Sequence, residues 1–307
     1  MKLVECVPNF SEGRRKEVID AIVREATSRN VKVLDVESDA DHNRTVLTFV
    51  GEPVAVVEAA LAVGGKAIEL IDLNKHRGQH PRMGSVDVVP FIPISDISMD
   101  ECVQIAKEFA NEYSNRFKVP VFLYEEAATR PDRRNLADVR KGEFEGLREE
   151  IGKNPDKNPD YGPNAIHPTA GATAVGARQI LIAYNINLAT DRPEIAKDIA
   201  AAIRTSGGGL PSLKALGLSL AERGVVQVSM NLTNHEETPL GVVFNRVREE
   251  AERRGVRVTE SEIIGLVPEA ALRGIDPASL LLRNFSSRQV LEARLRDPAS
   301  GAPPRSR

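Results

Sequence analysis

Residues 31–71 read VKVLDVESDADHNRTVLTFVGEPVAVVEAALAVGGKAIELI, and their pattern sets the fold. Two extended runs, Val31–Glu37 and Arg44–Val50, are separated by the polar turn Ser38–His42, which predicts a β-hairpin. In Pro53–Ile71 the apolar residues recur at helical spacing, which predicts a helix. The stretch therefore predicts a strand-strand-helix unit from which the neighbouring elements can be placed.

Further elements are expected on both sides of this unit. They are a strand at Leu3–Pro8, a helix at Arg15–Ser28, a strand at Val86–Ile94, a helix from Ser98 through Phe117 and a strand at Val119–Tyr124. Pro90 and Pro93 interrupt the strand 86–94 and predict an edge or irregular strand, because proline donates no ladder hydrogen bond. Ser98 and Glu101 have the spacing of a capping box. The order is β-α-β-β-α-β with one extra α-β unit.

The second half repeats this order with different residues. Its expected elements are a strand at Gln179–Leu188, a helix marked by Ile195, Ile199 and Ile203, strands at Ala215–Leu220 and Val225–Asn231 joined by the turn Glu222–Gly224, a helix capped by Thr238 and ending near Arg254, and strands at Val256–Thr259 and Ile263–Val267. Between the halves, residues 129–165 are rich in Arg, Asp, Asn and Pro and predict a connector without a long element.

Two such units predict an α+β fold. We expect two ferredoxin-like (βαββαβ) subdomains that form an α/β sandwich with a groove between them. The expected N-terminal subdomain covers residues 1–175 and the C-terminal subdomain residues 176–285. Residues 286–307 lack apolar periodicity towards their end and are expected to be a disordered tail.

The composition narrows the function classes. The 307 residues carry 41 basic and 44 acidic side chains that are interspersed, so we expect no nucleic-acid partner. The sequence contains no apolar run long enough to cross a bilayer and no secretory segment, which predicts a cytoplasmic protein without membrane contact. Cys6 and Cys102 have no Cys or His at metal-binding spacing and are expected to pack in the core.

The densest group of chemically active residues is the loop His76–Asp87, between a helix and a strand. Pro81 restricts the backbone of His80 to extended conformations, so His80 is the candidate base of this loop. A solvated basic loop without function is the alternative. A metal site is a second alternative, since His76 and His80 are four residues apart, but Gly78 and Pro81 oppose the helix that this spacing would need. We expect no metal.

Two further segments are candidates for binding. The segment 161–178 is rich in Gly, Pro and small residues, which allow a flat ligand to lie against the backbone, with hydrogen bonds from Thr169, Thr173 and Arg178; a plain interdomain linker is the alternative. The acidic residues of the stretch 35–45 could orient a histidine, although hairpin turns commonly contain such residues. His42 and His235 are interpreted as surface histidines without a role.

Several motifs resemble one family in the same order along the chain. They are Leu3–Gly13, Asn43–Val46, Gly78–Gly84, Asp87–Pro93, Gly171–Ala174 and Ala183–Leu188. These stretches resemble glutamate formiminotransferase, the transferase half of formiminotransferase-cyclodeaminase, and the resemblance runs from residue 3 to about residue 273.

The resemblance implies an enzyme of histidine degradation and one-carbon metabolism. Such an enzyme moves the formimino group of N-formimino-L-glutamate to N5 of tetrahydrofolate and gives 5-formiminotetrahydrofolate and L-glutamate. The implied enzyme is a homodimer of two ferredoxin-like subdomains per chain, and it needs no cofactor beyond tetrahydrofolate as co-substrate. Two other readings stay open: a related folate enzyme that acts on formylglutamate or 5-formyltetrahydrofolate, and a non-catalytic folate-binding protein.

The resemblance also implies roles for individual residues. His80 corresponds to the catalytic histidine, and Glu37 stands where the family has an assisting aspartate. The folate-contacting stretch corresponds to Gly162, Pro163, Asn164, Ala165, Ile166, His167, Pro168, Thr169, Ala170 and Gly171. Ala170 stands where the family has a tryptophan, a departure that concerns the stacking of the pterin. Substrate carboxylates are expected to bind Arg77, Arg82 and Arg44, because a guanidinium can grip a carboxylate with two hydrogen bonds.

Overall fold

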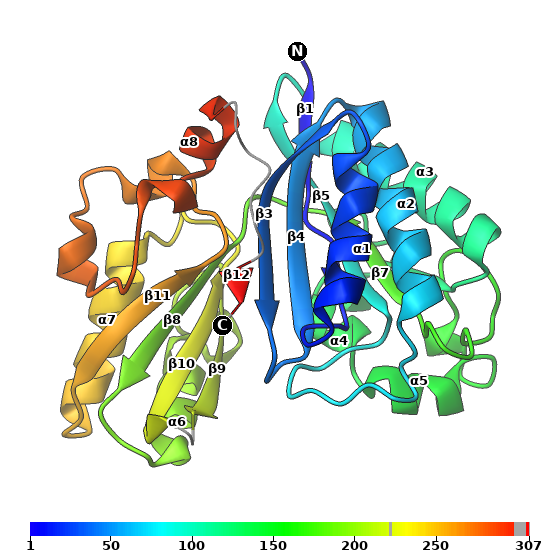
Figure 1. The fold of residues 1–307 in the computed structure, drawn as a ribbon. Coiled ribbons are helices and arrows are strands. Elements are labelled where there is room, and N and C mark those ends of the chain that lie inside the picture. Colours follow the sequence, from blue (N-terminus) through cyan, green and yellow to red (C-terminus); the bar gives the residue numbers. More distant parts are fainter. Residues whose placement is uncertain (221–222, 298–304, 307) are drawn as a thin grey trace. The chain divides into compact units, whose positions relative to one another are not determined.

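The computed structural model describes residues 1–220, 223–297 and 305–306. The chain divides into two compact units. Unit 1 contains Met1–Arg178 and the short strand β12 (Arg305–Ser306), and unit 2 contains the described residues of Gln179–Pro298. The elements follow the mixed α/β order expected from the sequence (Figure 1).

Unit 1 is built on one large sheet. Its elements are β1 (Leu3–Cys6), β2 (Asn9–Phe10), α1 (Lys16–Thr27), β3 (Val31–Asp39), β4 (Arg44–Gly51), α2 (Pro53–Leu70), β5 (Val86–Ser95), α3 (Met99–Phe117), β6 (Val121–Glu125), α4 (Leu136–Val139), α5 (Glu143–Glu150) and β7 (Thr173–Ala177). The sheet order is β12-β3-β4-β1-β5-β7-β6, and β2 pairs with β4 and β5. The hairpin β3-β4 and the helix α2 agree with the pattern of residues 31–71.

The apolar core of unit 1 lies between this sheet and three helices. The helices α1, α2 and α3 cover one face of the sheet (Figure 1). Ser98 accepts from the backbone N–H of Glu101, and the Glu101 side chain accepts from the backbone N–H of Ser98, so the predicted capping box opens α3. The predicted connector contains only the short helices α4 and α5 together with single 3₁₀ turns.

Residues 86–94 were expected to form an edge or irregular strand; the strand is irregular as expected, but it does not lie at the edge of the sheet. The strand β5 is interior: it pairs antiparallel with β1 and parallel with β7. Pro90 loses a donor but keeps its carbonyl, which accepts from the backbone N–H of Val7 at 3.4 Å. Beside Pro93 the register with β1 shifts between Leu3 and Val4. The bulge accommodates Pro93, and Pro90 keeps its carbonyl hydrogen bond, so both prolines fit within an interior strand.

Unit 2 is a four-stranded antiparallel sheet with the predicted β-α-β-β-α-β element order. Its elements are β8 (Ile182–Leu188), α6 (Pro193–Ile203), β9 (Leu213–Leu220), β10 (Val225–Leu232), α7 (Leu240–Arg253), β11 (Val258–Ile264) and α8 (Leu291–Arg296). The strand order is β11-β8-β10-β9. Of the predicted turn Glu222–Gly224, Glu222 lies outside the described residues.

Three predictions for unit 2 are corrected. One strand, β11, replaces the two expected at 256–259 and 263–267. Thr238 does not cap α7, because its hydroxyl donates to the carbonyl of Pro211 at 2.6 Å and the helix begins at Leu240. Residues 286–297, expected to be disordered, form a 3₁₀ turn and α8, with Leu291 buried and its N–H bonded to the carbonyl of Val267. Of the expected tail, residues 298–304 and 307 lie outside the described residues.

Among the helices of the described residues, none combines the length and the apolar character that a bilayer crossing requires.

Candidate active site

The loop between α2 and β5 is fastened to the turn between β3 and β4. The backbone N–H of Gln79 donates to the carbonyl of Asp41 at 3.2 Å. The side-chain amide of Asn43 donates to the carbonyl of Arg77 at 3.0 Å, and Nε2 of His76 lies 2.9 Å from the carbonyl of Asn43. A Cβ on Gly78 would lie 2.2 Å from the carbonyl oxygen of His42, so the close approach requires glycine.

His80 lies half-buried at the end of this loop. Its Nδ1 lies 2.7 Å from the carbonyl oxygen of Pro81. Burial lowers the pKa of His80 to about 2, and the positive charges of Arg44 and Arg140 act in the same direction. The imidazole is therefore neutral at neutral pH. Since a carbonyl only accepts, Nδ1 carries the proton and Nε2 keeps its lone pair.

A buried ion cluster adjoins His80. Oδ2 of Asp87 is paired with Nη1 of Arg44 at 2.8 Å and with Nη2 of Arg140 at 2.5 Å. Oδ1 accepts from the backbone N–H of Met83 at 2.9 Å. Burial opposes ionisation of Asp87, but Arg140 and Arg44 outweigh it and hold its pKa below the usual range. One carboxylate thus faces two guanidinium groups, which leaves one positive charge in excess beside His80.

A second imidazole lies next to His80. The rings of His42 and His80 meet edge to face with centroids 6.1 Å apart. Nδ1 of His42 lies 3.0 Å from Oδ1 of Asp39, and this hydrogen bond raises the pKa of His42. His42 was interpreted as a surface histidine without a role, yet the structure places it in contact with the loop that carries the candidate base.

The predicted assisting residue, Glu37, is buried on β3. It stands opposite Val46 in the register with β4, and Asp39 stands opposite Arg44. Residues two apart on a strand share a face, so Glu37 lies on the same face of the sheet as Arg44. Of the carboxylates, Asp87 raises the pKa of His80 most.

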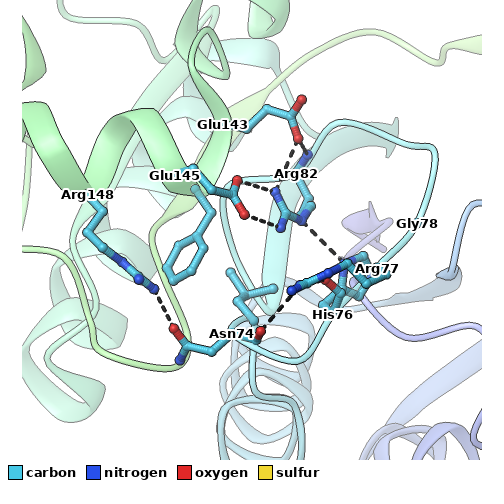
Figure 2. A pocket seen from close by; sticks show the side chains of 10 residues that line it. Asn74, His76, Arg77, Gly78, Arg82, Glu143, Glu145 and Arg148 are labelled. Carbon is cyan, nitrogen blue, oxygen red and sulfur yellow. Dashed lines mark hydrogen bonds and ion pairs between the residues drawn. The ribbon is translucent and has the colours of Figure 1, made fainter.

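On the other side of the loop is a pocket with a volume of about 400 Å³ (Figure 2). His76, Arg77, Gly78 and Arg82 line it from the loop, and Glu143, Phe144, Glu145 and Arg148 line it from α5. Leu73 and Asn74 complete the lining.

Arg82 spans this pocket with four of its five N–H donors already engaged. Its Nη1 and Nη2 each lie 2.7 Å from an oxygen of Glu145, and Nη1 lies 3.2 Å from Glu143 (Figure 2). Its Nε donates to Nδ1 of His76 at 3.3 Å. Burial and the charge of Arg82 lower the pKa of His76. Arg82 therefore fixes the loop to α5, whereas Arg77 and Arg148 are exposed cations at the rim.

The predicted folate segment, residues 162–171, lies against the same pocket. The side-chain amide of Asn74 donates to the carbonyl of Pro168 at 3.0 Å, and the N–H of Leu73 donates to the carbonyl of Thr169 at 2.9 Å. Gly171 has φ of 74°, and a Cβ there would lie 2.2 Å from the carbonyl oxygen of Met83. Backbone contacts therefore join the segment to the wall of the pocket.

Two small residues predicted to contact a ligand are instead in the core. Ala170 is 1% exposed and belongs to the main apolar cluster of unit 1. Thr173 is fully buried, and its hydroxyl donates to the carbonyl of Val86 at 2.8 Å. The exposed residues of the predicted segment are Gly162, Asn164, Ala165 and Pro168.

Sequence reasoning missed Arg140 and the pocket-lining residues of α5. Arg140 follows α4 in the connector, where no periodicity indicates which side chains are buried. Its Nε is buried without a hydrogen-bond partner. The only signal in the sequence is the density of arginine in the connector, which does not single out this residue.

Comparisons with known proteins cover nearly the whole chain. Residues 3–178 match the model of the formiminotransferase domain, N-terminal subdomain, and residues 183–292 match that of the formiminotransferase domain. A glutamate formimidoyltransferase of Streptococcus pyogenes is 50% identical over 296 residues, which is 96% of this chain and 99% of the relative. A glutamate formimidoyltransferase of Thermoplasma acidophilum is 46% identical over 304 residues, 98% of this chain and 99% of the relative. A formimidoyltransferase-cyclodeaminase of Gallus gallus is 47% identical over 289 residues, 92% of this chain and 53% of the relative.

Proposed function

The chain belongs to the formiminotransferase family, and from this premise we infer that it is an enzyme that transfers the formimino group of N-formimino-L-glutamate to tetrahydrofolate. The acceptor atom is N5, and the products are 5-formiminotetrahydrofolate and L-glutamate. Two relatives that match along 99% of their own length are glutamate formimidoyltransferases, 50% and 46% identical to this chain.

His80 is the proposed base, and its hydrogen bond to Pro81 is the observation that supports this role best. With the proton held on Nδ1, the lone pair of Nε2 is available throughout the neutral range. Attack of N5 on the amidine carbon gives a cationic, strongly acidic N–H, which a weak base can deprotonate. The imidazolium then returns the proton to the glutamate nitrogen as the C–N bond breaks, so His80 acts as base and then as acid.

Glu37 is proposed to assist His80 through its charge. It is buried on the face of the sheet that carries Arg44, and a carboxylate on that face favours the protonated imidazole that forms during transfer. Arg44 is proposed to bind a substrate carboxylate, because the ion cluster on Asp87 carries a positive charge in excess. Arg82 is assigned a positioning role instead, since four of its five N–H donors are already engaged within the protein.

Tetrahydrofolate is proposed to bind in the pocket beside the loop, against residues 162–171. The pocket has a volume of about 400 Å³, within the usual range for a small-molecule site. The exposed guanidinium groups of Arg77 and Arg148 at its rim suit the carboxylates of the glutamyl tail. No metal or further cofactor enters the proposal, because the amidinium is already an electrophile.

The scaffold of the proposed enzyme consists of two ferredoxin-like subdomains with a boundary near residue 175. The strand order β11-β8-β10-β9 supports this reading for the second subdomain, as does the order β3-β4-β1-β5 within the larger sheet. A homodimeric state and a cytoplasmic location complete the proposal.

An assay with separate donors tests the function. The protein is incubated with tetrahydrofolate and N-formimino-L-glutamate, and released L-glutamate is measured. In parallel reactions N-formyl-L-glutamate replaces the donor, or 5-formyltetrahydrofolate replaces tetrahydrofolate. We expect folate-dependent release from the formimino donor. Release only with a formyl compound would indicate the related folate enzyme, and folate binding without any release would indicate a non-catalytic protein.

A further inference from the structure

We propose that Arg140 binds the α-carboxylate of the formimino donor, together with Arg44, beside His80. This inference rests on the proposed function and adds a residue that neither the sequence motifs nor the loop at 76–82 contains. Arg140 comes from the connector between β6 and β7, so the connector contributes to the site.

The first argument is charge. Asp87 is completely buried, and the side chains of Arg44 and Arg140 are 9% and 13% exposed. Both guanidinium groups meet the same oxygen of Asp87, so their two positive charges share one negative charge. A desolvated cation without a counter-ion is costly, and a bound anion removes that cost. The cluster therefore favours an anionic ligand.

The second argument is the hydrogen bonds that remain. Arg44 is held at three points, because Nη1 is on Asp87 while Nε and Nη2 both donate to Oδ1 of Asn9, at 3.1 and 2.9 Å. Arg140 is held less completely, since its Nε is buried without a partner. A buried donor without an acceptor is uncommon in folded proteins and often marks a site that is completed by a ligand or an ordered water. Arg140 is therefore the better candidate of the two for direct contact with the donor.

The third argument is the order of atoms in the donor. The formimino nitrogen and the α-carboxylate are attached to the same carbon, whereas the γ-carboxylate lies two methylene groups further away. A base that acts on the formimino group must therefore have an α-carboxylate close beside it. Asp87 links this cation pair to the loop that carries His80, because its Oδ2 is paired with both arginines while its Oδ1 accepts from the backbone N–H of Met83 at 2.9 Å. The cation pair is thus the group that we assign to the α-carboxylate.

The substitution Arg140→Gln tests this assignment without leaving a charge unpaired. Asp87 then retains Arg44, and the cluster becomes neutral, so the variant is expected to fold. We expect KM for N-formimino-L-glutamate to rise at least about tenfold, the value of one hydrogen bond to a charged group. KM for tetrahydrofolate should stay unchanged, and Arg140→Lys should recover part of the loss. Arg134→Gln, an exposed arginine of the same connector, is the matched control.

Amides of the donor identify the carboxylate concerned. With the wild-type protein, the α-amide should show the same rise in KM that Arg140→Gln causes, and the γ-amide should not. In Arg140→Gln, the α-amide and the parent donor should become equivalent. An unchanged KM in Arg140→Gln, equal changes for both substrates, or loss with the γ-amide instead of the α-amide would each overturn the proposal.

Binding measured without turnover separates this inference from the proposed function. Calorimetry with N-formyl-L-glutamate in the absence of folate needs no transfer. Weaker binding to Arg140→Gln than to the wild type would support the carboxylate site even if the wild-type protein released no glutamate from the formimino donor. Equal binding to both proteins would overturn the carboxylate site even if the transferase reaction were demonstrated.

Discussion

Nδ1 of His80 donates a hydrogen bond to the carbonyl oxygen of Pro81, 2.7 Å away. The acceptor belongs to the residue that also restricts the backbone of His80 to extended conformations. Pro81 therefore affects His80 in two ways. Its ring limits the backbone conformation of His80, and its carbonyl determines which imidazole nitrogen carries the proton. The free nitrogen, Nε2, is consequently the one that performs the chemistry.

The pKa values of His80 and His42 should be shifted in opposite directions from that of an ordinary histidine. Burial with Arg44 and Arg140 lowers the pKa of His80, and the hydrogen bond to Asp39 raises that of His42. His80 should therefore stay neutral down to about pH 5, whereas His42 should lose its proton above the usual value of about 6.5. Imidazole NMR of the five histidines, assigned by single substitutions, measures both values and the tautomer. Titration of His80 near 6.5 would contradict the structure.

Asp87 should contribute much of the stability of unit 1. Asp87→Asn leaves Arg44 and Arg140 without their carboxylate, which should lower the free energy of unfolding by about 3–5 kcal/mol. Asp132→Asn, at a surface pair with Arg130, should cost far less because that pair is screened by solvent. Urea unfolding at neutral pH measures both changes. Equal losses of unfolding free energy in the two variants would show that the buried ion cluster contributes no more than a surface pair.

The buried cluster of Asp87 with Arg44 and Arg140 also predicts that stability depends on pH. The pKa of Asp87 lies below its unfolded value, so its stabilising effect is complete above about pH 4 and is lost as the pH falls through the folded value. The difference in unfolding free energy between the wild type and Asp87→Asn should therefore be constant near neutrality and should shrink below about pH 4. A constant difference at all pH values would show that the pKa of Asp87 is the same in the folded and the unfolded protein.

Gly78→Ala should impair catalysis more than stability. The new Cβ would lie 2.2 Å from the carbonyl oxygen of His42, so the loop that carries His80 must move. A displacement of about 1 Å can cost 10²-fold in rate, and we expect kcat to fall at least about tenfold. In Gly146→Ala, on α5, the new Cβ meets nothing within 4 Å, so kcat should be unchanged. Equal kcat values for the two variants would argue against the loop as the catalytic element.

Glu37→Gln should lower kcat by less than substitution of His80. Glu37 is buried on the face that carries Arg44 and is proposed to act on the imidazole through its charge. Removing that charge should lower the pKa of the protonated His80 in the reacting complex. The measurement is kcat as a function of pH for both proteins. Coincident profiles would remove Glu37 from the mechanism.

Most elements could be predicted from the sequence because their signals are local. The capping box at Ser98 and Glu101 and the periodicity of α1 and α3 act within single elements, and the structure agrees within a residue or two. The placement of β5 could not be predicted, because a bulge in its pairing with β1 makes room for Pro93. Residues 286–297 are ordered by backbone hydrogen bonds to Val267, which no local pattern reveals.

The residues of the candidate site also fall into those that local sequence could predict and those that it could not. His80 could be predicted because proline, glycine and arginine surround it within one loop. Arg140 and His42 could not, since both acquire their partners through tertiary contacts: Arg140 on Asp87, and His42 beside the ring of His80. Arg82 shows the reverse case, because its neighbours in sequence suggested a ligand contact while the fold surrounds it with Glu143 and Glu145.

The turnover of His80→Ala tests the central claim most directly. Glutamate release from N-formimino-L-glutamate and tetrahydrofolate is measured for this variant and the wild type, with circular dichroism and folate binding as checks that the fold persists. We expect kcat to fall at least about tenfold, the lower range of acid-base catalysis being about 10²-fold, while folate binding is retained. Wild-type turnover in His80→Ala would show that another group moves the proton.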